Sequence, residues 1–236
     1  MDDFRLPRAP FLIVNLKSYL SREQTLRLGE CADSLSLSFE TDIFITAQPL
    51  HLADLSKAAP DLLVTAQHMD ADQNKASMGR VLPETLVEVG AKAVMLNHAS
   101  HHLALNTLDL AINSAKEYGL LTLVCADSES ECRAVAELGP TIVICEPTSH
   151  IGTGTMISGD YVARTTAAVK HVNSEILVVQ AAGVSCGADI RRLLEQGADG
   201  SGGTMAVVGA SDWGSILRDM LTSISDYRMC QTRSER

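Results

Sequence analysis

The sequence alternates short apolar segments with longer amphipathic ones along almost its whole length, and this alternation limits the possible folds more than any other feature. Short runs of Val, Ile, Leu and Ala are typical of strands that are buried on both faces. Because a helical segment separates each strand from the next, the strands are expected to run parallel in one sheet. The expected strands cover residues 11–14, 42–47, 62–66, 93–96, 121–125, 142–145, 176–179 and, with a weaker glycine-rich signal, 198–203.

The first expected helix begins after Ser21, where Ser21 and Gln24 have the spacing of a capping box. The expected helices cover residues 21–32, 51–58, 83–89, 103–118, 129–138, 160–172, 188–196 and 213–224. Eight strands that alternate with eight helices predict an α/β fold, a single-domain (β/α)8 TIM barrel. The turn after the first strand lacks the glycines of a dinucleotide-binding fingerprint, which argues against an open doubly wound sheet.

The chain has 236 residues without a break in composition, so we expect one domain over residues 1–236. We expect residues 1–10 and 227–236 to be peripheral, and the polar tail from Tyr227 to be frayed. Residues 67–80 are polar and show no clear periodicity. Loops of that length inside a compact domain are usually functional or interfacial.

The net charge is −10 and the sequence shows no basic face of the kind that nucleic-acid binding needs, so no nucleic acid is expected as a partner. Aromatic residues make up 4% of the chain, so the core is expected to be aliphatic. Six cysteines without a CxxC pair are expected to be reduced thiols. No signal-peptide pattern and no apolar run of membrane-spanning length occur, so a cytoplasmic protein without membrane contact is expected.

Polar residues stand where three of the expected strands end. The first strand runs into Asn15 and Lys17, the fourth into Asn97 and His98, and the sixth into Glu146. The carboxyl ends of all strands of a β/α barrel meet at one mouth. A carboxylate base, an imidazole and an ammonium group around one pocket suit proton abstraction next to a carbonyl. Each residue alone is explained as well by a solvated strand end or a core histidine, so the hypothesis rests on their joint placement.

Three of these motifs carry a resemblance to a known family. Asn15-Leu16-Lys17, Asn97-His98 and Glu146-Pro147, the last followed by Ile-Gly-Thr-Gly at 151–154, resemble the triosephosphate isomerase family in its short archaeal form. The resemblance extends from residue 11 to about residue 224. Further matching segments are 66–68, 81–84, 124–125 and 182–185.

The resemblance implies interconversion of glyceraldehyde 3-phosphate and dihydroxyacetone phosphate through an enediolate, a step of glycolysis and gluconeogenesis. It implies that Glu146 moves the proton and that His98 serves the two substrate oxygens. Lys17 and Asn15 would stabilise negative charge, and residues 147–155 would form a lid that excludes water. The resemblance implies neither a cofactor nor a metal ion.

The family's phosphate contacts correspond here to backbone amides in the lid and in the last two turns between strand and helix. The implied substrate-binding residues are Ile151, Gly152, Gly183, Ser201, Gly202 and Gly203. We expect a bulky side chain at Gly202 or Gly203 to weaken phosphate binding with little loss of stability. The resemblance also implies a homo-oligomer that exchanges residues 67–80 between subunits, with a homotetramer favoured over a homodimer.

The sequence departs from the family at two places. Residues 200–204, Gly-Ser-Gly-Gly-Thr, replace a short apolar strand, and Ser100 replaces a glutamate that usually pairs with the strand-one lysine. We therefore expect Lys17 to be less ordered before substrate binds. Two alternatives stay open: an aldose–ketose isomerase for another short sugar phosphate, such as a tetrulose phosphate, and an inactive phosphate-binding barrel. A metal site at His98, His101 and His102 is disfavoured because further ligands are not evident.

Overall fold

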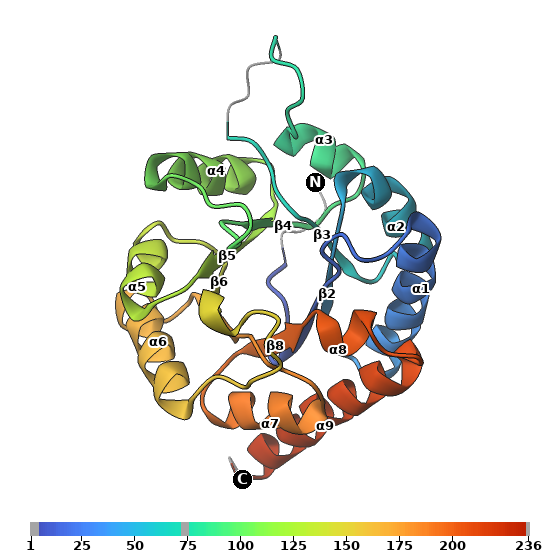
Figure 1. The fold of residues 1–236 in the computed structure, drawn as a ribbon, viewed down its shortest axis with the longest axis vertical. Coiled ribbons are helices and arrows are strands. Elements are labelled where there is room, and N and C mark those ends of the chain that lie inside the picture. The colour runs from blue at the N-terminus through green and yellow to red at the C-terminus, as the bar shows by residue number, and fades with distance from the viewer. Residues whose placement is uncertain (1–4, 72–75, 235–236) are drawn as a thin grey trace.

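The computed structural model describes residues 5–71 and 76–234, and within these ranges eight parallel strands close into a barrel surrounded by helices (Figure 1). This confirms the predicted (β/α)8 TIM barrel, and every expected strand is present. The strands, each paired with the next and the last with the first, are β1 (Phe11–Asn15), β2 (Ile43–Ala47), β3 (Leu63–Ala66), β4 (Ala93–Leu96), β5 (Leu121–Ala126), β6 (Ile142–Cys145), β7 (Leu177–Gln180) and β8 (Gly200–Gly203).

The helices pack around the outside of the barrel (Figure 1). They are α1 (Arg22–Ser38), α2 (Leu52–Ala58), α3 (Pro83–Glu88), α4 (Leu105–Glu117), α5 (Glu129–Glu137), α6 (Gly159–Val172), α7 (Gly187–Glu195), α8 (Met205–Val208) and α9 (Trp213–Ser234), with 3-10 turns η1 (Pro49–His51) and η2 (Thr148–His150). The capping box of Ser21 and Gln24 is present at the start of α1. No helix in the described ranges combines the length and apolar character needed to cross a membrane.

Each strand buries side chains on both of its faces, which is why the strands read as continuous apolar runs. One face fills the barrel, where Phe11 and Phe44 meet edge to face with ring centroids 5.3 Å apart. The other face packs against the helices, and Leu12 and Val14 belong to that larger outer core. Both cores are aliphatic apart from the few aromatic rings, as the composition predicts. The rigid barrel fixes where each strand ends and therefore where the polar side chains of the mouth begin.

The glycines of β8 are required by the closeness of β1. A Cβ atom on Gly200 would lie 2.6 Å from the Phe11 ring, and one on Gly202 would lie 1.9 Å from the carbonyl oxygen of Ile13. β8 pairs with both β7 and β1, so it is the strand that closes the barrel. The expectation that a side chain at Gly202 costs little stability is therefore wrong. Helix α8, which follows β8 directly, is absent from the sequence-based prediction.

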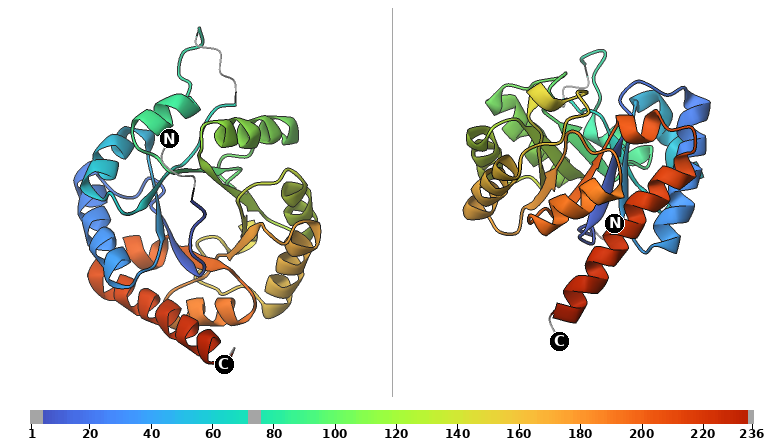
Figure 2. Two further views of the ribbon diagram at one scale, coloured as in Figure 1. Left: turned by 180° about the vertical axis from the view of Figure 1, so that it is seen from behind. Right: turned by 60° about the horizontal axis from the view of Figure 1, so that its bottom comes forward.

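The predicted fraying from Tyr227 is also wrong, because α9 continues to Ser234 and projects beyond the barrel (Figure 2). Arg228 anchors this part of the helix. Its guanidinium donates hydrogen bonds to the carbonyl oxygens of Pro10 (2.7 Å) and Glu40 (3.1 Å) and to the Thr41 hydroxyl (3.1 Å). These acceptors come from the N-terminal segment and from the turn before β2, so α9 ties both to the end of the barrel opposite the mouth.

Candidate active site

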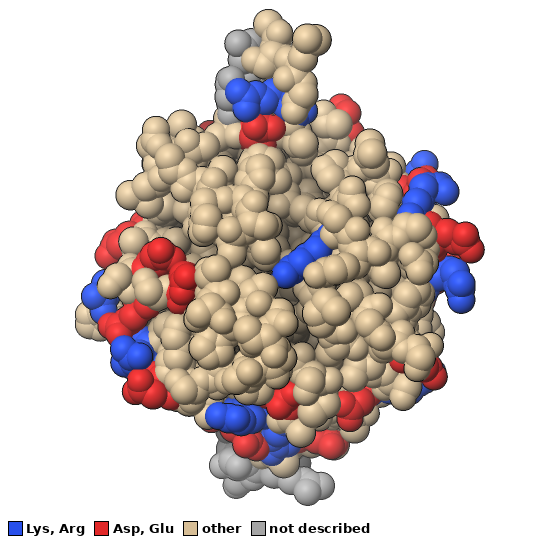
Figure 3. Space-filling view, viewed as in Figure 1, with Lys and Arg blue, Asp and Glu red and all other residues tan. Residues whose placement is uncertain are grey.

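The carboxyl ends of the strands enclose one cavity at the mouth of the barrel. Asn15, Lys17, His98 and Glu146, all singled out from the sequence, line it together. Figure 3 shows this face of the molecule hollowed near its centre, with most charged side chains around the outer edge and a basic one reaching into the hollow. Further lining residues come from β1, from β4 to β8 and from the segments that follow β7 and β8; they are Ile13, Met95, Cys125, Ile144, Val179, Ala181, Gly202, Gly203 and Thr204.

Lys17 is held in a left-handed backbone conformation, with φ of 47°. The Asn15 side chain stabilises it, because Asn15 Oδ1 accepts hydrogen bonds from the Lys17 N–H (3.0 Å) and from the Thr46 hydroxyl (2.7 Å). Gln67, at the end of β3, donates from Nε2 to the Lys17 carbonyl oxygen. Strain of this kind costs roughly 1–3 kcal/mol and persists only where the surroundings impose it. The sequence did not indicate these contacts: Thr46 lies in β2, which pairs with β1, and Gln67 follows β3 within the 66–68 segment that matches the family.

His98 lies in a turn that Asn97 holds. Asn97 adopts φ of 57°, donates from Nδ2 to the Cys125 carbonyl oxygen (3.0 Å) and accepts from the Leu103 N–H (3.0 Å). The Ser100 N–H points at His98 Nδ1 over 3.1 Å, which requires a lone pair on that nitrogen. Burial, followed by the charges of Lys17 and His102, lowers the pKa of His98. His98 is therefore a neutral imidazole with its proton on Nε2, and Nε2 is buried without a partner in the described structure.

Glu146 follows β6 directly and is only partly exposed. Burial raises the pKa of its carboxyl group, and the positive charge of Lys17 opposes that rise. Its backbone N–H donates to the Ala126 carbonyl oxygen (3.0 Å), whereas its side chain makes no hydrogen bond within the described residues. A carboxylate that is poorly solvated and unpaired is a stronger base than one in water, which suits proton abstraction.

The predicted lid, residues 147–155, begins with Pro147 and contains η2. Every hydrogen bond that it makes within the described structure joins two of its own residues, such as Thr153 N–H to the His150 carbonyl oxygen (3.2 Å). Gly152 and Gly154 have φ of 75° and 70°. Ile151 lines a small recess beside Glu146. The lid is thus a self-contained segment attached directly to the candidate base.

The predicted phosphate-binding residues differ in whether they line the cavity. Gly203 lines the cavity and has room beside it, because a Cβ there would lie 3.7 Å from the nearest atom outside its immediate neighbours. Gly183 touches the end of the lid, where a Cβ would lie 2.2 Å from the Thr155 carbonyl oxygen. The Ser201 side chain is fully buried and donates to the Gln180 carbonyl oxygen (3.0 Å). The structure does not bring that side chain into the cavity, whereas Thr204, the last residue of the 200–204 segment, lines it.

The remaining histidines of interest lie outside the cavity. The rings of His68 and His101 lie with centroids 4.1 Å apart and planes tilted by 47°, next to Asp70 and Arg80. Burial lowers the pKa of His68, and the neighbouring His101 lowers it further. Within residues 5–71 and 76–234, no three His, Cys, Asp or Glu side chains gather closely enough to hold a metal ion.

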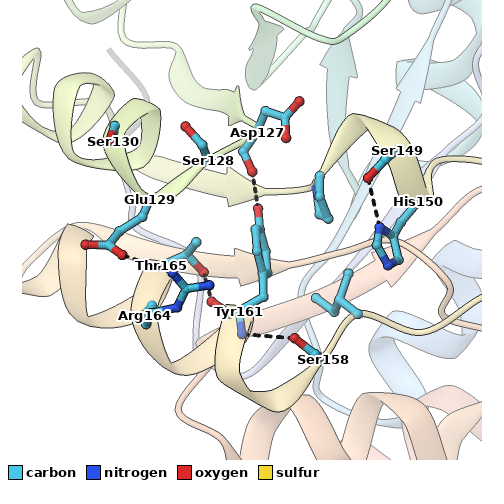
Figure 4. A pocket seen from close by; sticks show the side chains of 12 residues that line it. Asp127, Ser128, Glu129, Ser130, Ser149, His150, Ser158, Tyr161, Arg164 and Thr165 are labelled. Atoms are coloured by element: carbon cyan, nitrogen blue, oxygen red, sulfur yellow. Dashed lines mark hydrogen bonds and ion pairs between the residues drawn. The ribbon is translucent and has the colours of Figure 1, made fainter.

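A second cavity lies between α5, α6 and the start of the lid (Figure 4). Tyr161 crosses it and donates from its hydroxyl to the Asp127 carbonyl oxygen (2.6 Å). Arg164 pairs with Asp160 at 3.0 Å and with Glu129 at 3.6 Å. The only arginine among the described residues that line this second cavity is therefore already paired with carboxylates, and neither Glu146 nor His98 lines the cavity. The cavity at the mouth is the better candidate for catalysis.

Comparison with known proteins agrees with this geometry. Residues 10–220 match the family model described as triosephosphate isomerase. The chain belongs to the triosephosphate isomerase family. The match covers all eight strands, so the whole barrel and every residue of the cavity fall within the family's extent.

Relatives within the triosephosphate isomerase family come from archaea. A protein from Methanopyrus kandleri named triosephosphate isomerase is 35% identical over 92% of this chain and 99% of its own length. Proteins of the same name from Caldivirga maquilingensis and Methanobacterium bryantii are 31% and 30% identical, over 90% and 93% of this chain and 96% and 99% of their own lengths. The predicted resemblance to the archaeal form is thereby confirmed.

Ser100 is the position at which this member of the triosephosphate isomerase family departs from the usual pattern nearest the chemistry. No carboxylate lies within 4.0 Å of the Lys17 ammonium in the described part of the chain. Lys17 is instead positioned through its backbone, by Asn15 and Gln67.

Proposed function

We propose that this chain interconverts glyceraldehyde 3-phosphate and dihydroxyacetone phosphate. The single observation that carries the proposal is the convergence of Glu146, His98 and Lys17 on one cavity at the barrel mouth. Membership of the triosephosphate isomerase family and the names of the archaeal relatives support the same reaction. The proposal needs no cofactor, because each proton transfer has a side chain to perform it.

The proposed chemistry divides the reaction among three side chains. The Glu146 carboxylate removes a proton from the carbon next to the carbonyl and returns it to the neighbouring carbon. His98 donates a hydrogen bond from Nε2 to the oxygen that becomes negative and moves the hydroxyl proton from one substrate oxygen to the other, and its unpartnered Nε2 supports this role. Lys17 stabilises the charge of the enediolate. The raised pKa of Glu146 and the lowered pKa of His98 both favour this division, because the base is strengthened and the donor stays neutral.

The phosphate group is proposed to bind backbone N–H groups at the mouth. Gly152 in the lid, Gly183 after β7 and Gly203 at the end of β8 are the amides that we assign to it. Glycine at these positions lets the backbone approach an anion without a side chain between them. We propose no part for the Ser201 side chain, because its hydroxyl is already used between β8 and β7. Lid closure over the phosphate would exclude water from the enediolate.

The chain is further proposed to be a homo-oligomer, with a tetramer favoured over a dimer, and to work in the cytoplasm. Within the segment 67–80, the described residues 76–80 extend beyond the barrel (Figure 1), and Met78 is 96% exposed, which suits contact with a second copy. All six cysteines lie in the described ranges and are free thiols, which suits a reducing compartment. Light scattering coupled to gel filtration measures the oligomeric state, and a monomeric mass would contradict the first part.

The substrate is tested with a coupled isomerase assay on a panel of compounds. We expect glyceraldehyde 3-phosphate to give the highest kcat/KM, a tetrulose or erythrose phosphate to be turned over poorly, and glyceraldehyde without phosphate to be nearly inert. A higher kcat/KM on the four-carbon phosphate would replace the proposed substrate while keeping the reaction type. Binding of a phosphoglycolate-like anion without turnover of any sugar phosphate would support the inactive barrel instead.

A further inference from the structure

Ser100 places two hydrogen-bonding groups on one nitrogen of His98. Its backbone N–H lies 3.1 Å from His98 Nδ1, and its hydroxyl oxygen lies 2.8 Å from the same atom. A glutamate at this position, as is usual in the family, has no hydroxyl to offer. The hydroxyl contact is therefore one that the usual glutamate could not make.

The direction of the hydroxyl hydrogen bond follows from the backbone. A backbone N–H can only donate, so His98 Nδ1 must carry a lone pair and cannot carry a proton. With a lone pair on Nδ1, the Ser100 hydroxyl must donate as well, and the two donors share that lone pair. The proton of the neutral ring is then confined to Nε2, the nitrogen that is buried without a partner beside the cavity.

We propose that Ser100 is a positioning residue, whose hydroxyl keeps His98 neutral, in the Nε2–H tautomer and aimed at the substrate oxygen. The proposal rests on the isomerase function proposed above. Ser100 touches neither substrate nor Glu146; it acts only through His98. Its role thus differs from that of the usual glutamate. Ser100 contacts the histidine, whereas Lys17 is positioned by hydrogen bonds to its backbone.

The surroundings of His98 explain why a second donor is useful. The charged and titratable groups that share its cavity or turn are Lys17 from the end of β1, Cys125 from β5, Glu146 after β6, and His101 and His102 from its own turn. Lys17 and His102 both disfavour a positive charge on the ring, whereas an ionised Glu146 favours one. A donor on Nδ1 opposes the attraction of Glu146, because it stabilises the ring only while Nδ1 keeps its lone pair.

The turn around Ser100 is built to hold this geometry. The His101 N–H donates to the His98 carbonyl oxygen (2.7 Å), and Asn97 bridges Leu103 and Cys125. The Ser100 side chain itself is exposed, so its hydrogen bond competes with water. We therefore expect a moderate effect on catalysis when the hydroxyl is removed.

The test compares Ser100→Ala, which loses the hydroxyl and keeps the backbone N–H, with Ser100→Thr, which keeps both. Ser38→Ala, which removes an exposed hydroxyl that donates to the Ser34 carbonyl oxygen within α1, is the matched control. Nitrogen-15 NMR of histidine-labelled protein reports which ring nitrogen of His98 is protonated and at which pH the ring titrates, without any substrate.

Ser100→Ala is expected to raise the pH at which His98 titrates and to lower kcat by roughly threefold to tenfold, the range for one net hydrogen bond, with little change in KM. Ser100→Thr should restore both values, and Ser38→Ala should change neither. Unchanged His98 resonances and unchanged kcat in folded Ser100→Ala would overturn the proposal. Because the NMR titration needs no turnover, a wild-type protein that fails the triose phosphate assay but shows the titration shift would refute the proposed function and retain the role of Ser100.

Discussion

The two segments that carry the proposed chemistry, residues 97–103 around His98 and the lid after Glu146, are attached to the barrel in opposite ways. Asn97 binds across to Cys125 of the neighbouring strand and back to Leu103. The lid makes hydrogen bonds only within itself in the described structure. Both segments contain exposed side chains, so exposure alone does not explain the difference.

The difference separates two requirements of proton transfer. The hydrogen-bond donor must lie in place before charge develops, because reorganising it during the reaction costs free energy. The base must instead admit substrate and then be enclosed, which needs a segment that moves as one piece. A turn that is hydrogen-bonded to the barrel holds His98 in place before charge develops. A lid whose hydrogen bonds are all internal can move as one piece and enclose Glu146.

The largest effect is expected at the base. Glu146→Gln removes the proton acceptor and should lower kcat by about 10²- to 10⁴-fold, the usual contribution of a general base. Glu146→Asp withdraws the carboxylate by one methylene, and a misplacement of about 1 Å can cost roughly 10²-fold. Steady-state kinetics measures both, with circular dichroism to check the fold. Wild-type turnover in both variants would remove Glu146 from the mechanism.

Asn97→Ala removes the side-chain hydrogen bonds that hold the His98 turn to the barrel. Two side-chain hydrogen bonds of about 0.5–1.5 kcal/mol each are lost, and alanine at φ of 57° adds roughly 1–2 kcal/mol of strain. Both stability and kcat should fall, kcat by roughly 10²-fold if His98 shifts by about 1 Å. Thermal denaturation and kinetics measure the two effects.

Asn97→Gly is the matched control, because glycine tolerates the left-handed backbone but has no side chain to form the bonds. It should lose as much activity as Asn97→Ala and less stability. Full activity in Asn97→Gly would show that these hydrogen bonds do not position His98.

The independence of the lid is tested by two alanine substitutions with equal local strain. Gly152 in the lid and Gly119 in the turn before β5 have φ of 75° and 72°, and a Cβ on either would meet no atom within 4 Å. Gly119→Ala should lower the free energy of unfolding by roughly 1–2 kcal/mol and leave kcat/KM unchanged. Gly152→Ala should do the reverse, lowering kcat/KM roughly tenfold with an unchanged Tm. Equal losses of Tm would mean that the lid folds cooperatively with the barrel.

The smallest effect concerns stability and pH. The pKa of Glu146 is raised in the folded state, so between about pH 4.3, the usual unfolded value, and the raised value the folded state binds more protons than the unfolded one. Wild-type stability should therefore decrease through that window as pH rises. Glu146→Gln lacks this loss, so its Tm should exceed that of the wild type slightly at pH 8 and match it near pH 4. A lower Tm for Glu146→Gln at pH 8 would show that the ionised carboxylate is stabilising.

The sequence predicted the barrel and the three catalytic candidates because both depend on local pattern, apolar runs and the residue that follows each run. It could not predict features set by contacts distant in sequence. β8 has no apolar side chains to recognise, since its glycines exist to fit against Phe11 and Ile13 of β1. The sequence predicted a frayed end for α9, because the groups that accept hydrogen bonds from Arg228 belong to residues 10 and 39–41, which are distant from Arg228 in the sequence.

The same limit applied inside the site. The sequence predicted that Ser201 and Gly202 both belong to a phosphate-binding loop. In the fold, the Ser201 hydroxyl instead donates to the Gln180 carbonyl oxygen. Ser100 was recognised as a departure from the family, and its contact with His98 became visible only once the turn was formed.

The central claim, that the Glu146 carboxylate carries a proton between adjacent carbons, is tested most directly by running the reaction in D2O and examining product and remaining substrate by proton NMR. The wild-type protein should form dihydroxyacetone phosphate that carries deuterium at C1, because a carboxyl proton exchanges with solvent during the transfer. Glu146→Gln at the same concentration should give neither product nor deuterium incorporation on that timescale. Product formation or deuterium exchange by Glu146→Gln at the wild-type rate would contradict the claim.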